Sequence, residues 1–238
     1  MNHVRRPVPQ QSFLFRLVAF FSRHQLSYLL RNSRHRRFFQ LLFVFVAGAT
    51  ALGIISILAF MTNLPLLFPQ LGPSAFILFY TPMSEQASPR NVMFSHLLGV
   101  VIGLLLLWLC SQAFPGMHST DTSVLNWQRE IVVACSMGLV CLLMVVFHCV
   151  HPPAAASALI ASLGYLNSPG HVLGIVAAVV LLLLAALFFN RVIGGLPYPL
   201  WKFDAKVAHH FGEMAGIPSN EITFWRQAAM KTFQSRNS

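Results

Sequence analysis

Acidic residues are scarce in this chain of 238 residues, which has six Asp and Glu against 16 Lys and Arg. Charged residues together make up 9% of the chain, whereas about 25% is usual in a soluble domain. So few charges exclude an ordinary water-soluble globule of this size. Disorder is excluded as well, because 56% of the residues are hydrophobic. The remaining class is an integral membrane protein.

The chain also lacks the cysteine patterns of a disulfide framework or a zinc knuckle. None of its cysteines forms a C-x-x-C pair, and all lie in apolar segments: Cys110, Cys135, Cys141 and Cys149. His148 and His151 have a spacing that suits two ligands on one helix face. Pro152 interrupts any helix there, however, and no third ligand is close in the sequence. We therefore expect neither a metal nor another cofactor.

Four long apolar runs predict membrane-spanning helices, because each can cross a hydrocarbon core of about 30 Å. They are Phe38–Phe60, Asn91–Phe114, Ile131 to Phe147 or Val150, and His171–Phe189. Two further apolar stretches contain prolines, which an ordinary helix cannot accommodate in its interior. Irregular backbone at membrane depth must be buried in protein or line a water-filled cavity, so we expect broken or half-helices there. These two stretches are Leu64–Tyr80 and His151–Leu166.

An internal repeat relates the two halves of the apolar region. Pro73 and Pro152, each in an interrupted stretch, are 79 positions apart, and Pro89 and Pro169, each before a long run, are 80 apart. The predicted fold is all-α, a polytopic membrane helix bundle of two related units. Each unit has a long helix, a Pro/Gly-interrupted short helix and a long helix. The units cover about residues 38–114 and 129–191. The domain crosses the membrane six times if the interrupted segments also cross it, and four times if they enter and leave on the same side.

The regions outside this domain are basic. Half of all Lys and Arg lie in a cytoplasmic arm at residues 1–37, where the run from Phe13 to Phe21 suits a surface helix. The tail at residues 192–238 is also basic on balance. Because positively charged flanks stay on the cytoplasmic side, we expect both termini of the domain at 38–191 to be cytoplasmic.

Helix starts in the interrupted stretches favour anion binding. Proline suits the first helical turn, since it has no N–H to leave unpaired. A helix start otherwise presents free backbone N–H groups and about half a positive charge. Two starts that share one cavity would bind a small anion, although the prolines could equally just end one helix and begin the next. The expected binding residues here are Gly72, Pro73, Ser74, His151, Pro152 and Pro153.

The absence of Asp and Glu from every span also favours an anion or a neutral solute, because cation and proton carriers usually need membrane carboxylates. Arg90, at the mouth of the second long run, either attracts the anion or anchors at the interface. A stripe of small residues at a spacing of four favours close helix packing, with pore lining by Asn91 and Ser95 as the alternative. The stripe consists of Asn91, Ser95, Gly99 and Gly103. A lone His96 favours a helix–helix hydrogen bond.

Three motifs in order resemble the HPP family of integral membrane proteins: LGPSA at 71–75, SPRN at 88–91 and HPPAAASA at 151–158. The resemblance covers about Phe39 to Arg191. It implies four membrane helices, and it implies transport, because chloroplast and cyanobacterial members are linked to nitrite. By resemblance, His151, Pro152 and Pro153 match the family signature. The resemblance leaves the Arg-rich arm and the C-terminal tail uncovered.

The expected function is therefore transport of a small inorganic anion, nitrite first, and not enzymatic catalysis, because no nucleophile–base or carboxylate pair is visible. The alternative is a membrane-anchored scaffold whose basic arm binds anionic lipid, nucleic acid or a partner protein. Nucleic acid is disfavoured because the arginines adjoin the first span. We expect the bilayer, the anion and anionic lipid at the arm as partners, and a homo-oligomer stays open. The bacterial inner membrane is the expected location, with the plastid inner envelope as the alternative.

Overall fold

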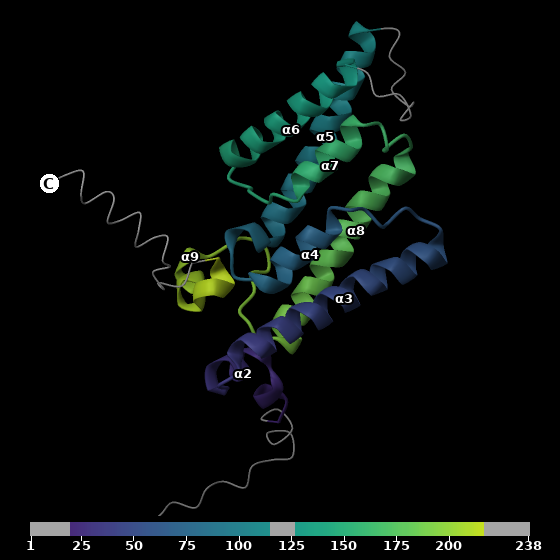
Figure 1. Cartoon of the computed structure of the whole chain (residues 1–238). Coiled ribbons are helices and arrows are strands. Elements are labelled where there is room, and N and C mark those ends of the chain that lie inside the picture. Colours follow the sequence, from purple (N-terminus) through teal and green to yellow (C-terminus); the bar gives the residue numbers. More distant parts are fainter. Residues whose placement is uncertain (1–19, 115–126, 217–238) are drawn as a thin grey trace, which may run out of the picture.

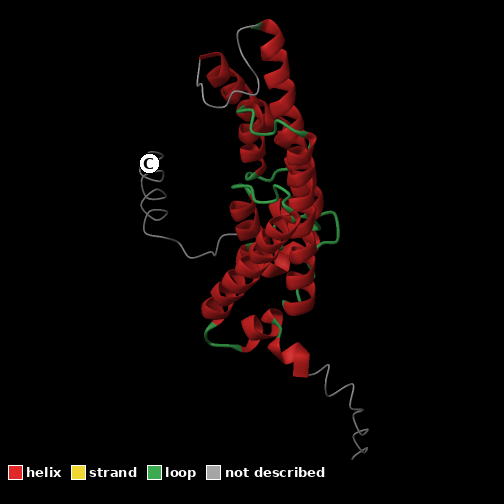
Figure 2. Ribbon diagram, turned by 90° about the vertical axis from the view of Figure 1, so that its right-hand side faces the viewer, coloured by secondary structure: helices red, strands yellow, loops and turns green. Residues whose placement is uncertain are grey.

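The computed structural model describes residues 20–114 and 127–216, and all regular structure in these ranges is helical (Figure 2). The four longest helices are α3 (Arg36–Thr62), α5 (Pro89–Ala113), α6 (Trp127–Val146) and α8 (Pro169–Leu187). A π-helical turn, η2 (Phe188–Ile193), continues α8. All four are long and apolar enough to cross a membrane. The four predicted spans are confirmed, with ends that differ by a few residues.

The interrupted stretches form short helices, as their prolines predict. They are α4 (Leu71–Tyr80) and α7 (Ala154–Ser162), with 10 and 9 residues. At about 1.5 Å per residue, neither can cross a 30 Å core alone. Non-helical backbone precedes each of them, at residues 64–68 and 149–151. Each interrupted stretch is thus part extended chain and part helix.

Hydrogen bonds at the ends of the helices fix the direction of the chain. The Gln40 side chain near the start of α3 donates to the Tyr80 carbonyl at the end of α4, at 3.5 Å. At the other end, Arg129 in the first turn of α6 donates to the Leu163 carbonyl just after α7, at 3.1 Å. Each interrupted stretch therefore returns to the end of the bundle from which the preceding long helix began (Figure 1). This path matches the six-crossing alternative.

The long helices exchange partners between the two predicted units. Helix α5 of the first unit packs on α6 and α7 of the second. Helix α8 of the second unit packs on α3 and α4 of the first (Figure 1). Interlocking of this kind is what two inverted repeats would produce. The repeat itself stays a prediction.

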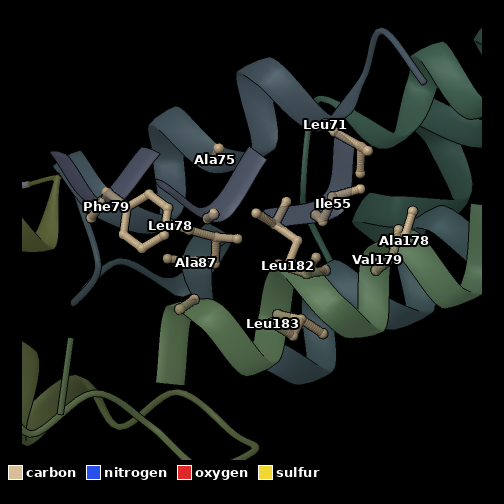
Figure 3. Packing of buried hydrophobic residues seen from close by; sticks show 14 of the residues in the cluster. Ile55, Leu71, Ala75, Leu78, Phe79, Ala87, Ala178, Val179, Leu182 and Leu183 are labelled. Atoms are coloured by element: carbon tan, nitrogen blue, oxygen red, sulfur yellow. The ribbon is translucent and has the colours of Figure 1, made fainter. Parts of the chain in front are cut away.

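A buried apolar cluster joins α3, α4 and α8 (Figure 3). Ile55 of α3, Leu78 of α4 and Leu182 of α8 are each at most 1% exposed within it. Other large apolar side chains point outward, such as Phe45 and Phe60, which are 72% and 84% exposed. An apolar outer surface of this extent suits lipid and not water.

Glycines allow a close contact between α5 and α7. A Cβ on Gly99 would lie 2.6 Å from the Ala154 carbonyl oxygen, and one on Gly103 would lie 2.6 Å from the Ala158 carbonyl oxygen. Only glycine allows backbones to approach this closely. The packing interpretation of the small-residue stripe is confirmed at these two positions.

The described segments before α3 and after η2 meet at one end of the bundle. The first includes α2 (Leu26–Asn32), and the second includes α9 (Ala205–Ala208) and η3, a 3-10 segment at His209–Ala215. The Ser27 amide donates to the Gly194 carbonyl at 2.9 Å, which joins the two. Of the predicted surface helix, residues 13–19 lie outside the described residues. The cytoplasmic orientation stays a prediction.

Candidate functional site

Four polar side chains form a buried network where the two interrupted segments meet. The Ser74 hydroxyl in the first turn of α4 lies 3.0 Å from Nε2 of His151 and 3.2 Å from Nε2 of His96. Nδ1 of His96 lies 2.7 Å from the hydroxyl of Ser157 in α7. All four side chains are at most 2% exposed. We call this the His–Ser network.

A backbone carbonyl determines the direction of every hydrogen bond in the His–Ser network. Nδ1 of His151 lies 2.8 Å from the Gln86 carbonyl oxygen, which can only accept, so Nδ1 carries the proton. Nε2 of neutral His151 then accepts from the Ser74 hydroxyl, and Ser74 accepts from Nε2–H of His96. Nδ1 of His96 accepts in turn from Ser157. With both histidines neutral, every ring nitrogen has one partner.

The carbonyl that orients His151 belongs to a 3-10 turn, η1 (Glu85–Ala87), between α4 and α5. Each of its three carbonyls accepts a side chain from a different part of the fold. Asn91 donates to Glu85 at 3.1 Å, His151 to Gln86, and the Tyr198 hydroxyl to Ala87 at 2.6 Å. This turn therefore ties α5, the His-Pro-Pro segment and the chain after η2 together.

The expectation of free backbone amides at the start of α7 is wrong. The amides of Ala154, Ala155 and Ala156 donate to the carbonyls three positions earlier, at 3.0 to 3.1 Å. These acceptors belong to the His-Pro-Pro residues 151–153, since Pro153 already has a helical conformation (φ −57°, ψ −22°). One tight turn before the helix therefore occupies the donors that were expected to bind an anion.

The LGPSA motif at residues 71–75 has one side chain in the His–Ser network and others on the outer surface. Helix α4 begins at Leu71, and Ser74 points inward, whereas Gly72 and Pro73 are exposed. A Cβ on Gly72 would meet nothing within 4 Å. In the second motif Pro152 is exposed and Pro153 is buried. Of these six predicted residues, only Ser74 and His151 enter the His–Ser network.

Arg90 and Asn91 lie at the start of α5, and their described hydrogen bonds do not include the His–Ser network. Arg90 donates from Nη1 to the His148 carbonyl at 3.0 Å and lies 5.8 Å from the ring centre of Phe94. Asn91 is 2% exposed and bonds η1. Both residues therefore hold the helix start in place, and Arg90 keeps a half-buried positive charge there.

His148 is not on a helix, because α6 ends at Val146 and His148 has a left-handed φ of 49°. Its side chain is exposed, whereas that of His151 is buried. Within the residues that the structure describes, no cluster of three or more His, Cys, Asp or Glu could hold a metal ion.

Two members of the His–Ser network were not among the predicted binding residues. His96 does bridge helices, as its isolation predicts, and it also joins Ser74 to Ser157. The sequence did not indicate a polar role for Ser157, because a serine in the run AAASALIAS is typical of a small residue that packs between helices. Only its position opposite His96 reveals a partner.

The comparisons with known proteins agree with the membrane fold. A family model described as HPP, transmembrane region, matches residues 33–199. A transmembrane protein of Dictyostelium discoideum is 26% identical over an alignment of 148 residues, and the match covers 58% of this chain and 46% of that protein. The chain thus spans less than half of that relative's length. No solved structure matches. On the family match over most of its length, this chain belongs to the HPP family of transmembrane proteins.

Proposed function

We propose that this protein transports a small inorganic anion across the membrane, with nitrite as the first substrate to test. The supporting observation is the His–Ser network, which buries two histidines where two broken helices meet. Ionisable residues at membrane depth are costly and usually belong to a solute pathway. Broken helices in matching halves are a common position for a transport site.

The chemistry of the network suits an anion. Its members offer N–H and O–H donors, and no Asp or Glu lies within the interrupted segments. A carboxylate there would repel an anion and attract a cation. Arg90 adds a positive charge at the start of α5, where it raises the local anion concentration.

The network is closed to solvent, so transport requires a change of conformation. Ser74 belongs to α4, which packs on α3 and α8, whereas His96 and Ser157 belong to α5 and α7, which pack on each other and on α6. Separation of α4 from α5 and α7 would free Nε2–H of His96 and the Ser74 hydroxyl. An anion between them would accept both hydrogen bonds, since nitrite oxygens are acceptors only.

Flux measurements on purified protein in proteoliposomes test the function. Nitrite, nitrate, formate and bicarbonate should be compared, and we expect uptake of nitrite above that of empty liposomes. His151→Ala should lower this uptake, because it removes an acceptor from Ser74 and a donor from Gln86. His171→Ala is the matched control, because His171 bonds only its own helix cap at Ser168 among the described residues. Equal uptake by both variants and the parent would remove the His–Ser network from the pathway.

We also propose that the protein resides in a bacterial inner membrane with both termini in the cytoplasm. The basic arm and tail support this orientation. Reporter fusions at each terminus, one active only in the cytoplasm and one active only outside, test it. Activity of the external reporter at either terminus would overturn the proposed orientation.

A further inference from the structure

A second site lies away from the His–Ser network, at the end of the bundle where α2, the start of α3 and η3 meet. It is a cavity of about 640 Å³. Arg31, Arg36, Arg37 and His210 line it, and no acidic side chain is among the described residues of its lining. Three guanidinium groups around one cavity create a strongly positive potential, which selects for an anionic ligand.

The start of α3 adds to this positive potential. This helix of 27 residues begins at Arg36, and within the described chain no side chain caps it and no acidic residue lies in its first turn. The aligned peptide dipoles therefore place about half a positive charge beside Arg36 and Arg37. Arginine forks bind phosphate oxygens in pairs, so the favoured anion is a phosphate group.

The remaining wall of the cavity, apart from Ser27 and Gln40, is apolar and is built from segments far apart in the sequence. Leu196 follows η2, and Phe211 and Met214 belong to η3. Leu196 and Met214 are 3% and 7% exposed, and the Met83 amide donates to the Met214 carbonyl at 2.9 Å. These contacts hold η3 against the bundle. The cavity thus combines a cationic part with an apolar part.

The height of the cavity along the bundle indicates where its ligand comes from. The apolar span of α3 begins at Phe38, which is 61% exposed and directly follows Arg37. The arginines therefore lie at the boundary between the lipid headgroups and the hydrocarbon core. A ligand at this boundary with a phosphate and an apolar portion is a phospholipid.

We propose that this cavity binds the headgroup of one anionic phospholipid. Its phosphate contacts Arg31, Arg36 and Arg37, and the glycerol and upper acyl carbons contact Leu196 and Phe211. This proposal is more specific than a general attraction of the basic arm to the membrane. Arg23 and Arg34 belong to the same arm but do not line the cavity. It does not depend on the transport proposal.

Native mass spectrometry of the full chain in a neutral detergent tests the site. Phosphatidylglycerol is titrated, with phosphatidylcholine as the zwitterionic comparison, and we expect one phosphatidylglycerol to be retained in preference. Each arginine contributes about fivefold in affinity, so Arg36→Gln with Arg37→Gln should weaken binding by about 25-fold. Arg23→Gln with Arg34→Gln removes the same charge and should leave binding unchanged. Equal weakening by both pairs would show diffuse attraction and overturn the proposal.

A second pair of variants tests the cavity from its other wall. His210→Glu places a carboxylate among the arginines and should abolish retention of the lipid. His209→Glu is the matched control, because His209 is also exposed but does not line the cavity. Loss in the control as well would overturn the site. Glycerol phosphate should not displace the lipid at equal concentration, and displacement would assign the cavity to soluble phosphates instead.

Discussion

The Ser74 hydroxyl and Nε2 of His151 lie 3.0 Å apart, although 77 positions separate the two residues. Each belongs to a different interrupted segment, and each lies at the start of a short helix. The two segments thus meet through side chains and not through free helix amides. This contact, extended by His96 and Ser157, places polar side chains between α4 and the pair of helices α5 and α7.

Ser74→Ala tests whether this contact stabilises the bundle. The change leaves Nε2–H of His96 and Nε2 of His151 without their described partner in a buried environment. An unsatisfied buried group costs about 1–3 kcal/mol, so we expect a clear drop in the thermal unfolding midpoint in detergent. Ser111→Ala is the control, because Ser111 bonds the Trp108 carbonyl of its own helix near its end. A drop no larger than in the control would contradict the network.

Gly99→Ala should loosen the contact between α5 and α7. The new Cβ would meet the Ala154 carbonyl oxygen at 2.6 Å and the Ala158 nitrogen at 3.1 Å, and backbone atoms cannot rotate away. Overpacking of this kind costs about 1–3 kcal/mol, measured as unfolding in detergent. Gly53→Ala, in α3 with nothing within 4 Å, should be neutral or stabilising by up to about 1 kcal/mol. Similar behaviour of the two variants would contradict the close approach.

Tyr198 should make stability depend on pH in the alkaline range. Burial raises the pKa of Tyr198 well above its usual value, so its hydroxyl keeps donating to Ala87 in the folded state. The unfolded chain releases this proton above about pH 10, which favours unfolding by about 1.4 kcal/mol per further pH unit. We expect thermal stability to fall from that pH upward.

Tyr198→Phe separates this effect from the other titrating groups. The variant should be less stable at neutral pH by about 1–3 kcal/mol, since the Ala87 carbonyl loses its donor. Above about pH 10, the stability of the variant should also fall less steeply with pH than that of the parent, because Tyr198 no longer contributes. Parallel pH curves for the parent and the variant would contradict a buried, protonated Tyr198.

Arg90 should contribute to uptake through its charge. Arg90→Gln should lower nitrite uptake in proteoliposomes by about tenfold if the charge concentrates the anion at the start of α5. Arg90→Lys keeps the charge but loses the planar fork, so it should retain most of the uptake. Equal losses in both variants would instead assign Arg90 to holding the turn at His148.

Several features of this protein were predictable from the sequence because they depend on composition and local chemistry. Apolar runs of sufficient length define membrane spans, since a bilayer requires satisfied backbone over about 30 Å. Prolines at 65, 69, 152 and 153 require broken helices for a similarly local reason. The positions of the long helices and of the two interrupted segments could therefore be predicted from the sequence.

The tertiary structure decided which of the motif residues meet. Spacing could not show that Ser74 and His151 share a hydrogen bond while Gly72 and Pro73 face outward, because the rotation of a short helix depends on its neighbours. Nor could it reveal that His96 and Ser157 join them, or that a tight turn occupies the amides of α7. Local sequence determines where a helix can form, but the packing of distant helices determines which of its side chains become partners.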